Sequence, residues 1–248
     1  MQYRADPKSG NKLSVLGFGC MRFPRGINID VTKSEKLVLQ AIEQGVNYFD
    51  TAYAYGGSEE VLGEILHKNN VRSKVFIATK LPHGKCKSYE DFDRLFDEQL
   101  RRLKTDYIDY YLIHNVPDRA AWNAVTAIGI ERWLAEKKTD GQIRHIGFSF
   151  HGTQAAFLEL LEVYPWEFCQ IQYNYMNENY QAGRSGLQKA HEKGLPVIIM
   201  EPLLGGRLAN DVPKKAVKLF HEADPGLTPA AWAMRWLWNQ PEVTGGKG

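Results

Sequence analysis

Short apolar runs alternate with amphipathic segments along most of the chain. Residues 1–14 alternate in polarity around a turn cluster and predict a hairpin. Apolar runs then predict buried strands at residues 15–20, 48–51, 75–80, 107–114, 143–149, 168–173 and 196–200. A helical pattern follows each strand. The first predicted helix begins at a Thr32–Glu35 capping box and the third at Ser88. The fourth predicted helix covers residues 124–138, and the seventh follows a long loop and is capped by Thr228.

This strict alternation predicts a parallel sheet covered by helices, hence an α/β protein. Units of ~30 residues repeated seven times fit a (β/α)8 TIM barrel with an N-terminal β-hairpin better than an open sheet. An eighth strand starts at residues 241–244 and runs into GGKG, so the barrel is apparently truncated within the eighth strand. If it stayed open, the first and seventh strands would carry unpaired edges, and the chain could lack a stable fold. No linker or composition shift divides residues 1–248, which predicts a single domain.

Titratable side chains stand where the predicted strands end. In such barrels the reactive residues lie at the carboxyl ends of the strands, and Asp50, Lys80 and His114 close three successive strands. Charged groups there are costly to bury unless they are paired. Tyr53 and Tyr55 follow Asp50 on a glycine-rich turn. Taken alone, that turn is equally compatible with a surface loop that carries tyrosines.

These residue types suit proton donation to an oxygen atom. A nearby lysine ammonium lowers the pKa of a phenol, and a carboxylate holds the lysine charged and oriented. An imidazole can hydrogen-bond and orient a substrate oxygen. Hydride addition to a carbonyl creates such an oxygen, and because no side chain delivers hydride, the combination implies a nicotinamide cofactor.

Motifs along nearly the whole chain resemble those of the aldo-keto reductases. They are LGFGCMR, FDTAYAYG, IATKL, YLIH, IRHIGFS, QIQYN and PL-x-GG. The resemblance implies reduction of an aldehyde or ketone to the alcohol with NADPH. Tyr55 would be the general acid, Asp50 and Lys80 would tune it, and His114 would position the carbonyl. NADPH rests on the family alone, since the segment that holds the 2′-phosphate follows the eighth strand, and NADH is not excluded.

The resemblance also assigns contacts position by position. Cofactor contacts would come from the carboxyl ends of several strands and from the loop after the seventh: Gly19, Met21, Asp50, Ser149, Gln170, Met200, Pro202, Leu203, Gly205 and Arg207. Ser149 and Gln170 would bond the nicotinamide carboxamide, and Arg207 would meet the pyrophosphate unless it is a surface residue. An apolar substrate wall would consist of Phe23, Tyr53, Trp122 and Phe150, each of which could equally be core.

Composition limits the partners. A formal net charge of +2 gives no reason to expect nucleic acid or an anionic membrane. No signal-like segment or run of ~20 apolar residues is visible, which predicts a cytoplasmic protein without membrane insertion. Cys20, Cys86 and Cys169 lack metal-site spacing, so we expect buried thiols, no metal and no iron–sulfur cluster. The segments GFSFHG and IIMEPLLGG are most similar to a bacterial branch of the aldo-keto reductases. Members of that branch often continue into a ferredoxin-like module, whose cysteines are absent here. The sequence does not indicate an oligomeric state.

Two other functions fit the same barrel. One is a cofactor-binding regulatory protein with little turnover. The other is an enzyme in which Lys80 forms a Schiff base, although the neighbouring Asp50 would stabilise the charged ammonium over the neutral amine that this chemistry needs.

Overall fold

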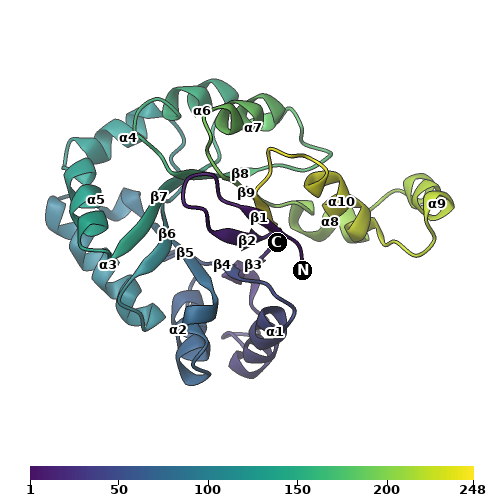
Figure 1. Cartoon of the computed structure of the whole chain (residues 1–248), viewed down its shortest axis with the longest axis horizontal. Coiled ribbons are helices and arrows are strands. Elements are labelled where there is room, and N and C mark those ends of the chain that lie inside the picture. Colours follow the sequence, from purple (N-terminus) through teal and green to yellow (C-terminus); the bar gives the residue numbers. More distant parts are fainter.

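Eight parallel strands form a closed barrel in the computed structural model, which describes residues 1–248 (Figure 1). The strands follow the chain around the barrel: β3 (Leu16–Gly19), β4 (Tyr48–Asp50), β5 (Phe76–Leu81), β6 (Ile108–Ile113), β7 (Ile143–Phe150), β8 (Phe168–Gln172), β9 (Val197–Met200) and β10 (Gly245–Lys247). Every residue of β6 and β8 is buried, as expected for parallel strands covered on both faces, and the polar residues Asp109, Gln170 and Gln172 are buried with them. The predicted (β/α)8 barrel is confirmed.

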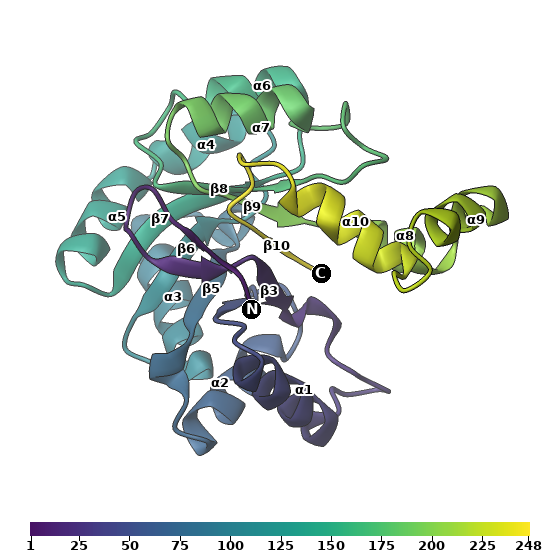
Figure 2. The ribbon, with the colours of Figure 1, turned by 45° about the vertical axis from the view of Figure 1, so that its right-hand side comes forward.

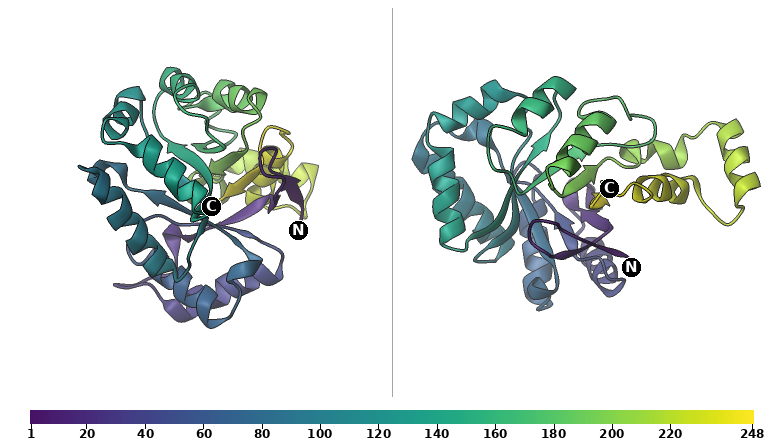
Figure 3. Two further views of the ribbon diagram at one scale, coloured as in Figure 1. Left: turned by 60° about the vertical axis from the view of Figure 1, so that its left-hand side comes forward. Right: turned by 45° about the horizontal axis from the view of Figure 1, so that its top comes forward.

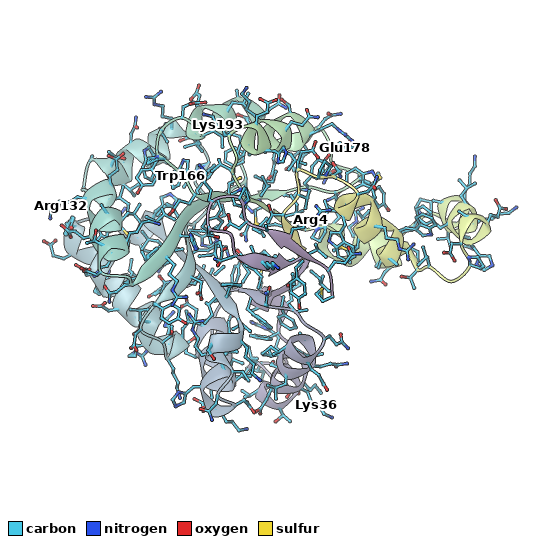
Figure 4. The ribbon with its side chains drawn as sticks, in the orientation of Figure 1. Arg4, Lys36, Arg132, Trp166, Glu178 and Lys193 are labelled. Carbon is cyan, nitrogen blue, oxygen red and sulfur yellow. The ribbon has the colours of Figure 1, made fainter.

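Helices surround the barrel on the outside, as Figures 2 and 3 show from different sides. The outer layer consists of α1 (Val31–Glu43), α2 (Ser58–Lys68), α3 (Tyr89–Leu103), α4 (Arg119–Thr126), α5 (Ile130–Thr139), α6 (Gln154–Leu160), α7 (Gly183–Glu192) and α10 (Pro229–Trp238). Charged side chains such as Lys36, Arg132 and Lys193 point outward from this layer (Figure 4). No helix is long and apolar enough to cross a membrane.

The helix α3 shows how the sequence sets the inner face. Its buried residues recur at helical spacing, from Phe92 through Phe96 to Leu103. The predicted capping box is present, and the Asp91 carboxylate accepts a hydrogen bond from the Ser88 N–H at 3.2 Å. Together these features fix where the helix begins and which face it buries.

Helix α1 begins earlier than the sequence analysis predicts, and its cap is different. The cap is Asp30, whose carboxylate accepts a hydrogen bond from the Lys33 N–H at 3.0 Å. Thr32 lies inside the first turn, so the predicted Thr32–Glu35 capping box is wrong. Asp30 is an equally good cap by residue type and has extended backbone angles, which a cap requires.

Two further segments differ from expectation. The helix predicted over 124–138 is divided into α4 and α5 by Gly129, whose φ of 96° lies in the left-handed region that favours glycine. The long loop after β9 contains the 3-10 turn η4 (Leu204–Gly206) and the helices α8 (Arg207–Asn210) and α9 (Lys214–Ala223). Helix α9 projects away from the barrel (Figure 1) and has no buried residue.

The predicted hairpin is present as β1 (Tyr3–Ala5) and β2 (Lys12–Ser14), which pair in antiparallel fashion across one end of the barrel (Figure 2). Its Asp6 carboxylate accepts a hydrogen bond from the Tyr110 hydroxyl of β6 at 2.9 Å. Arg4 lies close to the segment after α10 (Figure 4) and donates to the carbonyls of Trp238, Gln240 and Val243. The hairpin therefore holds both a barrel strand and the last connection of the chain.

The eighth strand closes the barrel. β10 pairs with β9 on one side and β3 on the other, with Gly246 opposite both Ile199 and Leu16. The alternative of an open barrel with unpaired edges is therefore wrong. The sequence analysis predicted that this strand starts at residues 241–244 and is cut short, but the paired residues are Gly245, Gly246 and Lys247. Glycine is depleted in strands because it contributes no side chain to packing, so the sequence pattern does not indicate these bounds. Here a Cβ on Gly246 would lie 3.0 Å from the side chain of Leu237, so the small residue suits the tight packing under α10.

Candidate active site

Strands β4 and β5 bring Asp50 and Lys80 together inside the barrel. Both side chains are 0% exposed, and Lys80 Nζ donates to Asp50 Oδ1 at 2.7 Å. A second hydrogen bond runs from Lys80 Nζ to the carbonyl of Thr51 at 2.6 Å. A lysine buried this deeply needs such partners, because an unpaired buried charge is costly.

The turn between β4 and α2 positions Tyr55. The Tyr55 N–H donates to the Ala52 carbonyl at 2.9 Å. The Ser58 hydroxyl donates to the Cys20 carbonyl at 3.0 Å and bonds Thr51 Oγ1 at 2.8 Å. These contacts hold the phenol ring over Lys80, whose Nζ lies 4.9 Å from the ring centroid.

His114 follows directly after β6 and faces Tyr55 edge-on. The two ring centroids are 6.0 Å apart with an interplanar angle of 87°. The His114 carbonyl accepts a hydrogen bond from Nδ1 of His83 at 2.8 Å, which steadies the backbone there. The structure thus brings together Asp50, Tyr55, Lys80 and His114, the four side chains that the sequence analysis assigned to proton transfer.

The charges of this cluster depend on burial and on its two lysines. Burial would raise the pKa of Asp50, but the ammonium groups of Lys247 and Lys80 and the Gln170 amide together lower it to about 2. Burial, assisted by Lys80, lowers the pKa of His114 to about 3, so its imidazole is neutral at physiological pH.

The pKa of Tyr55 is raised, whereas the sequence analysis predicted that it would be lowered. We expected a nearby lysine to lower it, yet burial and the Asp50 carboxylate raise it to about 12. The cation that opposes this rise is Lys247. The expectation omitted burial, which disfavours the charged phenolate whatever cation stands beside it. Tyr55 is consequently a protonated phenol in the folded protein.

A cavity of about 490 Å³ opens above these residues at the carboxyl ends of the strands. Several of the predicted cofactor-contact residues line it: Gly19, Met21, Met200, Pro202, Leu203 and Gly205. Tyr55 and His114 also line it, so two groups of the cluster reach the space that a ligand could fill.

Gln170 and Ser149 are buried and are not among the residues that line the cavity, but their hydrogen-bonding groups bear on whether the site suits a nicotinamide. The Gln170 amide donates to Asp50 Oδ2 at 2.7 Å, and its Oε1 is buried without a hydrogen-bond partner. Ser149 Oγ accepts from the Asn115 N–H at 2.8 Å, and its hydroxyl hydrogen can still be donated. A carboxamide supplies the complementary N–H and C=O groups. The residues present therefore fit a nicotinamide cofactor.

Two of the predicted cofactor contacts have other surroundings. A Cβ on Gly19 would lie 1.9 Å from the Gly248 carbonyl oxygen, so the chain itself approaches this glycine. Arg207 is exposed at the start of α8 and is not among the residues that line the cavity. Arg22 does line it, and its guanidinium lies 3.4 Å from the position of a Cβ on Gly205. The cation beside the glycine loop is thus Arg22.

The four residues predicted to form an aromatic substrate wall pack away from this cavity. Phe23, Trp122 and Phe150 belong to the hydrophobic core, and Tyr53 packs under the Arg102 guanidinium at 4.3 Å from its ring centroid. None of the four lines the cavity. Trp122 lies on α4 and Phe150 ends β7, and an aromatic residue beyond or at a strand end packs inward or toward a pocket with the same sequence pattern, so the pattern could not separate a pocket wall from core.

The cavity includes five polar residues that the sequence analysis did not assign: Arg22, Asn115, His151, Glu201 and Lys247. Asn115, His151 and Glu201 each follow a strand end directly or within one residue, so the rule that reactive groups follow strands could have found them. Lys247 carried no such signal because the eighth strand was predicted at residues 241–244 and as cut short, whereas the paired residues are Gly245–Lys247. The structure has no group of three or more His, Cys, Asp or Glu side chains that could hold a metal ion, and all three cysteines are buried and unpaired.

Comparison with known proteins gives a consistent result. The family model described as Aldo/keto reductase family matches residues 15–245. Methylglyoxal reductase YeaE of Escherichia coli is 32% identical over 226 residues, which is 88% of this chain and 74% of the relative. An aldo-keto reductase of Mycobacterium sp. (strain JLS) is 32% identical over 141 residues, 56% of this chain and 47% of that relative. This match therefore covers about half the length of the mycobacterial protein.

A solved structure shares the fold. The holo form of an aldo-keto reductase from Bacillus halodurans superposes with a TM-score of 0.81 at 24% identity, covering 100% of this chain and 86% of the other. The barrel, the site and the family match define an aldo/keto reductase fold. The chain belongs to the aldo/keto reductase family.

Proposed function

We propose that this protein is an NAD(P)H-dependent oxidoreductase that reduces an aldehyde or ketone to the alcohol, with Tyr55 as general acid. The observation that carries the proposal is the Tyr55 phenol at the cavity floor, edge-on to His114 at 6.0 Å and 4.9 Å above the Lys80 ammonium. Family membership supports the reaction class. We further propose NADPH as the preferred cofactor, a cytoplasmic location and a single barrel domain.

A bound nicotinamide cofactor would supply the hydride. Gln170 Oε1 and the Ser149 hydroxyl would hold its carboxamide, because one is a buried acceptor without a partner and the other a donor. Met200 would lie against the ring as an apolar floor. Gly205 and Gly206, both with positive φ, would allow the backbone to approach the phosphates closely, with Arg22 beside them.

Tyr55 and His114 would act on the same substrate oxygen, Tyr55 as proton donor and His114 as hydrogen-bond donor. With a pKa of about 12, Tyr55 stays protonated and can give its proton to an oxygen that gains negative charge. With a pKa of about 3, His114 stays neutral and can donate one N–H to the same oxygen without protonating it. Lys80 is held by Asp50 and the Thr51 carbonyl, and both contacts favour an ammonium over a Schiff-base nucleophile.

The substrate class follows from the lining of the cavity. Asn115, His151 and Glu201 stand where the sequence analysis expected aromatic side chains. Polar walls favour a substrate that carries hydrogen-bonding groups besides its carbonyl. We therefore propose a small polar aldehyde or ketone, and methylglyoxal is a reasonable first probe because a relative bears that name.

The test measures NADPH consumption with methylglyoxal and with an aromatic aldehyde. Tyr55→Phe should lower turnover by ~10²–10⁴-fold, since it removes the proton donor and keeps the ring. Tyr53→Phe is the matched control, because Tyr53 packs under Arg102 outside the cavity, and it should turn over like the wild type. Equal rates for wild type and Tyr55→Phe would refute the role of Tyr55.

Cofactor binding is measured in parallel by quenching of protein fluorescence. Both variants should still quench on addition of NADPH, because the proposed carboxamide contacts come from Gln170 and Ser149. Quenching without any turnover in the wild type would refute the reductase and point to a binding protein. Titration with NADH tests the proposed preference for NADPH.

A further inference from the structure

A second lysine reaches the same carboxylate as Lys80. Lys247 lies on β10 with its side chain 8% exposed, and its Nζ donates to Asp50 Oδ1 at 2.5 Å. Lys80 Nζ donates to that same oxygen at 2.7 Å. Asp50 is thus held between two ammonium groups, one from the neighbouring strand β5 and one from β10, 197 residues further along the chain.

The geometry of the barrel explains why the Lys247 side chain lies next to Asp50. β10 lies between β9 and β3, and Lys247 is in register with Met200 on one side and Gly17 on the other. Gly17 has no side chain to block the approach; a Cβ there would lie 3.3 Å from Cβ of Lys247. Lys247 also lines the cavity together with Tyr55 and His114.

The charges at this floor do not cancel. One carboxylate, Asp50, faces two ammonium groups, and the Gln170 amide also points its N–H at the carboxylate. Lys80 has a second partner in the Thr51 carbonyl, while the hydrogen bond of Lys247 goes to Asp50 alone. Asp50 and the two lysines together therefore carry one excess positive charge beneath the Tyr55 phenol, whereas the Glu201 carboxylate, which lines the same cavity, raises the pKa of Tyr55 as Asp50 does.

We propose that Lys247 is a positioning residue of the proton-donor site, which neutralises Asp50 jointly with Lys80 and stabilises the Tyr55 phenolate that forms when the phenolic proton leaves. The inference rests on the proposed function and extends it. In the reduction, the O–H bond of Tyr55 breaks, its electron pair stays on the phenolate oxygen, and the proton bonds the substrate oxygen. The reductant is the reduced nicotinamide of the proposed function.

The electrostatic direction agrees with the geometry. Burial and Asp50 raise the pKa of Tyr55, and Lys247 lowers it. Without Lys247, the negative Asp50 would face the phenol with Lys80 as its only cation. A nearby opposite charge shifts a pKa by about one unit or more, and Lys247 lines the same cavity as Tyr55. The role of Lys247 is therefore visible as a shift in the ionisation of residue 55.

The test replaces Tyr55 by a phenol that ionises near neutral pH and absorbs visible light when ionised. Tyr55→3-nitrotyrosine gives one such reporter, and its ionisation midpoint is read by absorbance in the otherwise wild-type chain. Adding Lys247→Met should raise the midpoint by about one pH unit, which is ~10-fold in the ionisation equilibrium. Lys247→Arg keeps the charge and should keep the midpoint.

Two further variants make the result decisive. Lys247→Gln can still donate a hydrogen bond to Asp50 but has no charge, so it should raise the midpoint as Lys247→Met does, and it serves if the methionine variant does not fold. Lys189→Met removes an exposed lysine paired with Glu192 and should change nothing. An unshifted midpoint in folded Lys247→Met or Lys247→Gln would overturn the proposal. The reporter needs no turnover, so this failure is distinct from failure of the proposed reductase.

Discussion

At the scale of single residues, burial decides the charge states of the site more than neighbouring charges do. Burial is the largest influence on the pKa of Asp50, Tyr55 and His114. It is overcome only at Asp50, where two ammonium groups and an amide converge on one carboxylate. For Tyr55 and His114 burial prevails, and both groups are neutral near pH 7. The site is therefore built around neutral hydrogen-bond donors that stand over a charged floor.

The neutral His114 has a consequence for stability. Its pKa is about 3 in the folded protein and ~6.5 in the unfolded chain. Between these values only the unfolded chain binds the proton, so stability falls as the pH falls from about 6.5 toward 3, by ~1.4 kcal/mol per pH unit at most.

We expect His114→Asn to remove this part of the acid sensitivity. Measured by urea unfolding, the loss of unfolding free energy between pH 6.5 and pH 5 should be smaller in His114→Asn than in the wild type, by up to about 2 kcal/mol. His83, His145 and His151, whose pKa values burial also lowers, contribute equally to both proteins. The same loss in both proteins would contradict a buried neutral His114.

At the scale of elements, sequence patterns predicted those parts whose cause is local. Seven strands, the N-terminal hairpin and the caps at Ser88 and Thr228 follow from apolar periodicity and capping chemistry, and the structure contains them. The break at Gly129 and the short helices after β9 were missed, because one glycine inside a helical pattern is compatible with both an intact and a broken helix. The eighth strand was predicted to start at residues 241–244, but β10 comprises Gly245–Lys247, because a glycine-rich segment has no periodicity that would place the strand.

Some glycines matter for packing between elements. Gly63 lies on α2 where α3 passes closely, and a Cβ there would be 2.3 Å from the Arg102 carbonyl oxygen and 2.6 Å from Leu103 Cα. These are backbone atoms, so the contact cannot be relieved by rotating a side chain. The distance between the two helices is therefore limited by the absence of a side chain at this position.

Accordingly, Gly63→Ala should lower the free energy of unfolding by ~1–3 kcal/mol, despite the better helix propensity of alanine. Gly26→Ala is the control, since a Cβ on Gly26 would have no neighbour within 4 Å, and a change within ~0.5 kcal/mol is expected there. Chemical unfolding of the three proteins gives the comparison. A Gly63→Ala protein as stable as the control would show that α2 and α3 can separate freely.

At the scale of the whole molecule, the sequence indicated which of the proposed proton-transfer side chains lie together better than it indicated the space around them. Strand ends are set by local pattern, so apolar periodicity alone assigns Asp50, Lys80 and His114 to one end of a barrel. Which side chains line the cavity depends on how the elements around that end pack together, and no local pattern indicated that Trp122 on α4 and Phe150 on β7 belong to the core. Lys247 depends on barrel closure, an interaction between residues almost the whole chain apart, and no local pattern reports it.

Barrel closure itself depends on the N-terminal hairpin. Arg4 donates to the carbonyls of Trp238, Gln240 and Val243, which lie between the end of α10 and β10. One side chain thus satisfies three backbone acceptors of the connection that leads into the closing strand. Lys247 reaches Asp50 only if that strand is in register, so the hairpin at one end of the barrel supports the site at the other.

We therefore expect Arg4→Met to loosen the closing strand before the rest of the barrel. The variant keeps an apolar stem and removes the donors, so unfolding free energy should fall by ~1–3 kcal/mol. Hydrogen exchange followed by mass spectrometry should speed up in peptides covering residues 239–248 and stay unchanged in β6 and β7. Arg132→Met, on the outer face of α5 (Figure 4), should leave both regions at wild-type rates. Uniform acceleration along the chain would instead mean that Arg4 supports global stability, and unchanged exchange at residues 239–248 would exclude any role for Arg4 in closure.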